Sequence, residues 1–224
     1  GYKLNEYGLF RGKKLIVCKT EKEIYKKLKM DTPPPETRTA TNEIESAKTH
    51  KLPKLISYND IKGDLHTHTT WSDGNNSIEE MAEAAKKLGR KYMAITDHTK
   101  NLFIAHGLDE KGLRRHGKEI DKINKKMRGF KILKGAEINI LKNGSLDIKN
   151  ETLKKLDIVS ASIHSNFKLP KADMTQRVIR AMQNPYLNII CHPTGRRIGR
   201  RPGYQLDWDE IFKACKKYGV ALEI

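Results

Sequence analysis

The stretch Gly63-Asp64-Leu65-His66 begins a regular alternation of short apolar segments and longer amphipathic ones that continues to Ile224. The apolar segments predict strands at 63–66, 92–96, 131–138, 157–163, 187–191 and 220–224. Between them the pattern predicts helices near 77–88, 109–127, 173–183 and 207–218. Such alternation is typical of parallel strands joined by crossover helices. We therefore expect an α/β fold, either an open doubly wound sheet or a barrel.

The residues before this region follow a different pattern. Two short strands at 8–10 and 15–17 and a helix beginning near Thr20 are predicted within residues 1–30, too little to fold alone. Residues 31–60 open with Pro33-Pro34-Pro35, which favours an extended linker, with one short helix near 42–48. We expect a small α+β region at 1–30, a Pro-rich linker at 31–60 and the main domain at 61–224.

Five of the eight histidines fall at or just after the ends of predicted strands. In a parallel barrel these carboxyl ends converge on one face, where active sites are built. A strand-end glutamate and an aspartate just beyond the first strand belong to the same set. The candidates are His66, His68, Asp73, His98, Glu137, His164 and His192. For His50, His106 and His116 we expect ordinary surface or hydrogen-bonding positions.

The spacing of the first two histidines suits a metal ion. His66 and His68 are two residues apart on an extended segment, so both imidazoles point to the same side. Imidazole and carboxylate ligands favour Zn, Mn or Fe over Ca, and this many ligands exceed the four that one zinc ion takes. The sequence therefore predicts a multinuclear site suited to phosphoester hydrolysis. We expect Asp64 and Asp97 to orient the N–H groups of ligand imidazoles rather than to bind metal.

A basic loop follows His192 and contains Arg196, Arg197, Arg200 and Arg201. Guanidinium groups match phosphate oxygens bidentately, so we expect this loop to clamp a substrate phosphate; the alternative is a solvated basic loop. The formal net charge of +17, from 44 Lys and Arg against 27 Asp and Glu, also predicts attraction to polyanions, with nucleic acid as the first candidate; the alternative is a solvated, Lys-rich surface.

Other composition features concern the cellular setting. Cys18, Cys191 and Cys215 are far apart and indicate neither a disulfide framework nor a thiolate zinc site. No run approaches the ~18 apolar residues of a membrane span, and the first residues lack a signal-peptide layout. We expect a monomeric protein of the cytoplasm without a membrane partner.

The strand-end motifs resemble the PHP (polymerase and histidinol phosphatase) domain over roughly residues 61–224. The shared pattern is an HxH segment, an Asp shortly after it, a TDH segment, a strand-end Glu and two later His segments. The opening Leu4-Asn5-Glu6-Tyr7-Gly8-Leu9-Phe10 resembles the end of the polymerase part in prokaryotic family X DNA polymerases. The arginine loop from Thr194 to Pro202 resembles the same subgroup.

This resemblance implies a distorted seven-stranded (β/α) TIM-like barrel with up to three Mn or Zn ions. It implies 3′–5′ exonuclease or abasic-site endonuclease action in DNA repair, with DNA and an upstream polymerase domain of the same chain as partners. By the same likeness one ion is held by His66, His68 and Glu137, a second by Glu137, His164 and His192, and a third by Asp73 and His98.

The sequence departs from the family pattern at its end. It stops at Ala221-Leu222-Glu223-Ile224, before the last strand and an Asp-x-His pair, so we expect a C-terminal fragment. Because the catalytic aspartates of a polymerase would lie upstream of Gly1, we do not expect the fragment to synthesise DNA. Two alternatives stay open: a small-molecule phosphatase of the histidinol-phosphate type, and a degraded PHP domain that scaffolds a polymerase.

Overall fold

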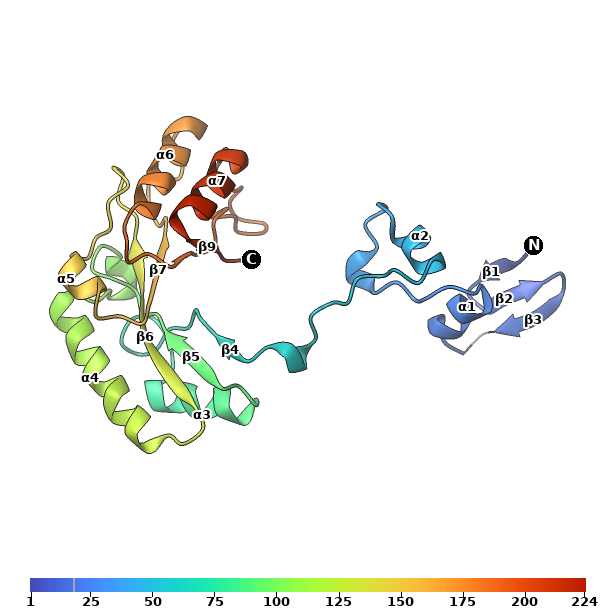
Figure 1. Cartoon of the computed structure of the whole chain (residues 1–224), viewed down its shortest axis with the longest axis horizontal. Coiled ribbons are helices and arrows are strands. Elements are labelled where there is room, and N and C mark those ends of the chain that lie inside the picture. Colours follow the sequence, from blue (N-terminus) through green and yellow to red (C-terminus); the bar gives the residue numbers. More distant parts are fainter. Residues whose placement is uncertain (18) are drawn as a thin grey trace. The chain divides into compact units, whose positions relative to one another are not determined.

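The computed structural model describes residues 1–17 and 19–224, so Cys18 lies outside the described residues. The chain forms two compact units, Gly1–Ser57 and Tyr58–Ile224 (Figure 1). The domain limits expected from the sequence stay predictions.

The first unit contains a three-stranded antiparallel sheet in the order β1-β2-β3. Its helix α1 begins where the sequence predicts, because the Thr20 side chain accepts a hydrogen bond from the Glu23 backbone N–H at 3.2 Å. The short strand β1 was not predicted. The elements are β1 (Lys3–Asn5), β2 (Gly8–Arg11), β3 (Lys14–Val17), α1 (Glu21–Lys27), η1 (Pro35–Thr37) and α2 (Glu43–Lys48).

The second unit is built on a six-stranded sheet whose order follows the chain, β4-β5-β6-β7-β8-β9, with every neighbouring pair parallel. The strands are β4 (Gly63–Asp64), β5 (Tyr92–Ile95), β6 (Lys131–Asn139), β7 (Ile158–Ser162), β8 (Ile189–Ile190) and β9 (Ala221–Leu222). This confirms the parallel α/β architecture. Because all strands run the same way, their carboxyl ends lie along one edge.

Helices connect these strands as the periodicity predicts, whereas the short helix α5 and the 3-10 turns η2 and η3 were not predicted. Ser77 and Glu80 form a reciprocal capping box at the start of α3. The elements are η2 (Tyr58–Asp60), α3 (Ile78–Lys87), η3 (Phe103–Ala105), α4 (Glu110–Lys126), α5 (Asn150–Leu153), α6 (Lys171–Met182) and α7 (Trp208–Tyr218).

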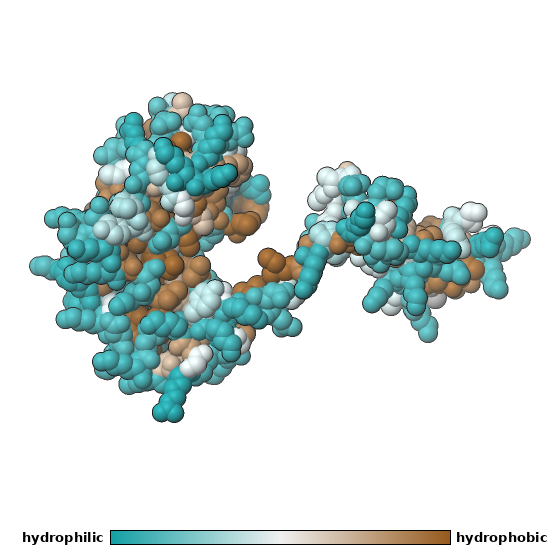
Figure 2. All heavy atoms as spheres, in the orientation of Figure 1, coloured by the Kyte–Doolittle hydropathy of each residue, from teal (hydrophilic) through white to brown (hydrophobic). Residues whose placement is uncertain are grey.

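The core lies between one face of the sheet and the helices. Side chains alternate across a strand, and Ala136 and Ile138 of β6 are buried in the core. Glu137 between them therefore points to the opposite face. In Figure 2 hydrophobic residues gather over the middle of this unit, where the strands lie, and hydrophilic residues cover much of its outline.

Two further sequence expectations concern cysteines and membranes. Cys191 is buried and Cys215 is half-buried, and both are free thiols. Across the described residues, no helix combines the length and apolar character needed to cross a bilayer.

Candidate metal centre

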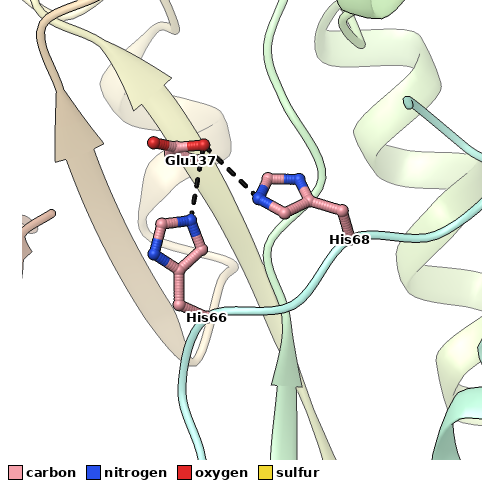
Figure 3. A group of neighbouring side chains, drawn as sticks. All are labelled: His66, His68 and Glu137. Carbon is pink, nitrogen blue, oxygen red and sulfur yellow. Dashed lines mark ion pairs between the residues drawn. The ribbon is translucent and has the colours of Figure 1, made fainter. Parts of the chain in front are cut away.

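Glu137 lies at the centre of the candidate site and is 1% exposed. Five imidazole rings surround its carboxylate. Figure 3 shows His66 and His68 reaching towards it from a single extended segment. The nitrogens of His66, His68 and His98 lie 3.4, 3.5 and 2.9 Å from Oε2. Those of His164 and His192 lie 3.3 and 2.7 Å from Oε1. The two carboxylate oxygens therefore divide the rings into two groups.

Asp73 completes the set on the far side of His68. Its Oδ1 lies 3.7 Å from Nδ1 of His68, and its Oδ2 lies 3.6 Å from Nε2 of His98. The structure therefore brings together all seven residues that the sequence singled out as ligands. Their individual roles as ligands stay predictions.

The donor atoms of this cluster fit divalent metal ions. Ligand atoms lie within 4.8 Å of one another in each of four groups of three residues. The Nδ1 atom of His68 is buried and has no hydrogen-bond partner among the described residues. Buried polar atoms are normally satisfied, so an unpartnered imidazole nitrogen beside a carboxylate fits a bound cation. The groups are His66-His68-Glu137, His66-Cys191-Glu223, His68-Asp73-His98 and His98-Glu137-His164.

The protonation of Glu137, His66 and His68 depends on burial and on neighbouring groups of the cluster. Burial alone would raise the pKa of Glu137, but the contacts with the surrounding histidines outweigh it, so the pKa falls far below its usual range and the group stays ionised. Burial and the neighbouring His98 lower the pKa of His68. Burial opposes charge on His66, but contacts with Cys191 and Glu137 raise its pKa to about 11. The ionised Glu137 carboxylate thus faces five imidazole rings. This arrangement suits a site in which cations bind a phosphate group.

Glu223 belongs to the site although the sequence interpretation passed over it. Its Oε1 lies 2.6 Å from Nδ1 of His66, and its Oε2 accepts a hydrogen bond from the His192 backbone N–H at 2.6 Å. The available signal was its position at the end of the last predicted strand, the same signal that identified Glu137. Glu223 therefore connects the first and the fifth predicted histidines of the cluster.

Asp64 and Asp97 make contacts that differ from the expected ones. Asp64 accepts a hydrogen bond from the backbone N–H of His66 at 3.0 Å, not from an imidazole. Asp97 is fully buried and lies 3.1 Å from Nε2 of His116, which is not a predicted ligand. Its oxygens also accept hydrogen bonds from Thr69 and Ser72, next to the HxH segment. Both aspartates thus hold the backbone of the segment that carries His66 and His68.

The arginine loop is not uniform. The Arg201 guanidinium lies 3.7 Å above the Phe167 ring and donates to the Gly195 carbonyl at 2.8 and 3.0 Å. Arg196, Arg197 and Arg200 are exposed, and no side-chain contact occupies their guanidinium groups within the described residues. Three of the four predicted phosphate-binding arginines are therefore free to contact a ligand, while Arg201 supports the loop.

Both parts of the chain are similar to known proteins. Residues 64–224 match the family model of the PHP domain, and residues 1–39 match that of the DNA polymerase beta thumb. A DNA polymerase/3′-5′ exonuclease PolX of Bacillus subtilis is 43% identical over the whole chain. A probable phosphatase of Thermoanaerobacter sp. is 37% identical over 72% of the chain.

The coverage of these relatives is partial. The chain spans 39% of the length of the Bacillus subtilis protein and 63% of the Thermoanaerobacter phosphatase. Among solved structures, the histidinol phosphate phosphatase of Lactococcus lactis, complexed with zinc, L-histidinol and phosphate, aligns with a TM-score of 0.53 at 20% identity. That alignment covers 73% of this chain and 72% of the other. It supports the fold.

Proposed function

Because this chain belongs to the PHP domain family of metal-dependent phosphoesterases, we propose that the cluster around Glu137 hydrolyses phosphodiester bonds in DNA. The carrying observation is the convergence of five imidazoles on one buried carboxylate, with the arginine loop beginning directly after His192. The finer proposal is 3′–5′ exonuclease or abasic-site endonuclease action in DNA repair.

The residues of the cluster divide into three proposed ligand sets. His66, His68 and Glu137 would hold one Mn or Zn ion, Glu137 with His164 and His192 a second, and Asp73 with His98 a third. When bound, such ions activate water and neutralise phosphate charge. The protein itself supplies the ionised carboxylate at the centre, holds the His66 ring through Glu223 and holds the backbone after His68 through Asp97.

Several features favour DNA as the substrate. The net charge of +17 attracts polyanions, and the exposed guanidinium groups of Arg196, Arg197 and Arg200 match phosphate oxygens. The thumb match at residues 1–39 and the likeness to a DNA polymerase/3′-5′ exonuclease support a polymerase context for this module. We propose DNA and a polymerase domain of the same protein as its partners.

A small-molecule phosphatase is the second candidate. It is favoured by the similarity to probable phosphatases over 72% of the chain. The two functions differ in the leaving group and in the need for a polyanion surface. Comparing the rates on DNA with a free 3′ end and on a phosphomonoester separates them, and a clear monoester preference would defeat the DNA proposal.

The metal requirement is tested with a double variant, His164→Ala with His192→Ala. We expect it to abolish Mn-dependent DNA cleavage and to leave DNA affinity largely intact, because the arginine loop is retained. His50→Ala is the matched control, since His50 is an exposed histidine outside the cluster. Cleavage retained in the double variant would contradict the assignment. Elemental analysis that finds no bound metal in the unaltered protein would favour a scaffolding role instead.

A further inference from the structure

A relay of buried, hydrogen-bonded polar residues, Asn139, Asp147 and Thr99, lies behind His164. Nδ1 of His164 is 2.7 Å from Oδ1 of Asn139, which follows Glu137 by two residues and points to the same face of β6. Asn139 and Asp147 are 5% and 6% exposed, and Thr99 is fully buried. Buried polar groups of this kind are expected to be satisfied in one defined arrangement.

Asp147 determines which way the Asn139 amide faces. A carboxylate only accepts hydrogen bonds, and Asp147 accepts them from the Thr99 hydroxyl at 2.8 Å and from the Asn101 backbone N–H at 3.1 Å. It also accepts from the Asn139 backbone at 3.1 Å and from Nδ2 of Asn139 at 2.8 Å. The amide nitrogen further donates to Thr99. Because these acceptors take the NH₂ group, the amide oxygen must face His164.

The facing oxygen in turn selects the tautomer of His164. An amide oxygen accepts a hydrogen bond, so Nδ1 of a neutral ring carries the proton and Nε2 carries the lone pair. That Nε2 lies 3.3 Å from Oε1 of Glu137 and 3.2 Å from Oγ of Ser162, whose hydroxyl donates to the same Glu137 oxygen. Because the Ser162 proton is directed at Glu137, the Nε2 lone pair faces two oxygen atoms, which is favourable only with a cation or a proton between them. The relay thus prepares His164 to act as a ligand.

We propose that Asn139 and Asp147 are positioning residues that hold His164 in the tautomer required for metal binding. This inference rests on the proposed metal-dependent function and adds residues that do not touch the ion. Hydrogen bonding of the second imidazole nitrogen commonly sets the orientation and affinity of a metal ligand, and its loss typically costs 10–100-fold in affinity. Asn139 and Asp147 act as one unit, because neither fixes the ring without the other.

The first readout is the tautomer itself. In metal-free protein labelled with ¹⁵N on histidine, at about pH 8 where a free ring is neutral, we expect His164 to be protonated at Nδ1. The isosteric Asp147→Asn variant lets the amide of Asn139 turn over, so both tautomers should appear. Asn139→Ala should have the same effect. Asn143→Ala is the control, since Asn143 is an exposed amide in the segment between β6 and Asp147.

The second readout is the Mn²⁺ dissociation constant, measured by calorimetry. Each single variant should weaken binding about 10- to 100-fold. An unchanged tautomer and unchanged affinity in folded Asp147→Asn would overturn the proposal. Failure of the unaltered protein to cleave DNA or a monoester with Mn²⁺ would count against the proposed function, independently of the tautomer.

Discussion

Nδ1 of His66 lies 2.6 Å from Oε1 of Glu223, although 157 positions separate the two residues in the chain. The contact joins the segment after the first strand of the sheet to the end of the last one. The other Glu223 oxygen accepts a hydrogen bond from the backbone N–H of His192. The opposite edges of a six-stranded sheet are therefore linked through one carboxylate beside the candidate metal centre.

Replacing Glu223 should weaken metal binding. Glu223→Ala leaves the His66 Nδ1 and the His192 N–H without their acceptor, so we expect Mn²⁺ affinity to fall about 10- to 100-fold. Glu223→Gln keeps one acceptor oxygen and should lose less. Calorimetric titration measures both. Glu83→Ala, which removes an exposed carboxylate on α3, should leave the affinity unchanged. Equal affinities in the Glu223 and Glu83 variants would show that the contact is dispensable.

Asp97 should matter mainly for stability. Asp97→Ala leaves the Thr69 N–H and two hydroxyl groups without their acceptor inside the protein, so we expect the free energy of unfolding to fall by about 3 kcal/mol or more. Urea denaturation measures the loss. Asp121→Ala removes a carboxylate that pairs with Lys134 at the surface and should cost about 1 kcal/mol or less. Similar losses in the two variants would refute this role of Asp97.

Arg177 should be a structural cation. It is 1% exposed, and its guanidinium donates to the backbone carbonyls of Leu141 and Ser165 at 2.9 Å each and to that of Ile140. Arg177→Met keeps an apolar side chain but leaves these carbonyl groups without a hydrogen-bond donor. We therefore expect a loss of about 2–4 kcal/mol in the free energy of unfolding. Arg180→Ala, one turn along on the exposed side of α6, serves as the control. A loss no greater than that of the control would contradict this prediction.

The arginine loop should show a division between binding and support. Arg200→Ala should weaken DNA binding and reduce the slope of log affinity against log salt by about 1, because one phosphate contact is lost. Fluorescence anisotropy at several salt concentrations gives the slope. Arg128→Ala should leave the slope unchanged. Arg128 is exposed and precedes β6, so it lies at the amino-terminal ends of the strands, whereas the arginine loop follows their carboxyl ends. An unchanged slope for Arg200→Ala would remove this residue from the proposed DNA surface.

Much of the fold could be predicted because its signals are local. The periodicities of strands and helices can be read from short stretches of consecutive residues. The capping pair Ser77 and Glu80 directly marks the start of a helix. The clustering of the candidate ligands could be predicted for a related reason. Carboxyl ends of parallel strands share one edge, so a histidine at each end implies a cluster without any knowledge of distances.

The partners of those ligands could not be predicted, because each depends on rotamers and on which elements become neighbours. Asp97 adjoins a candidate ligand in the chain and yet binds His116, since α4, which carries His116, packs against the neighbouring strand β6. The same holds for the relay through Asn139 and for Glu223. The sequence by itself determined the parallel α/β architecture and the residues that meet at its edge. Only the tertiary structure decided how each ring is held, because those hydrogen bonds join segments that core packing alone brings together.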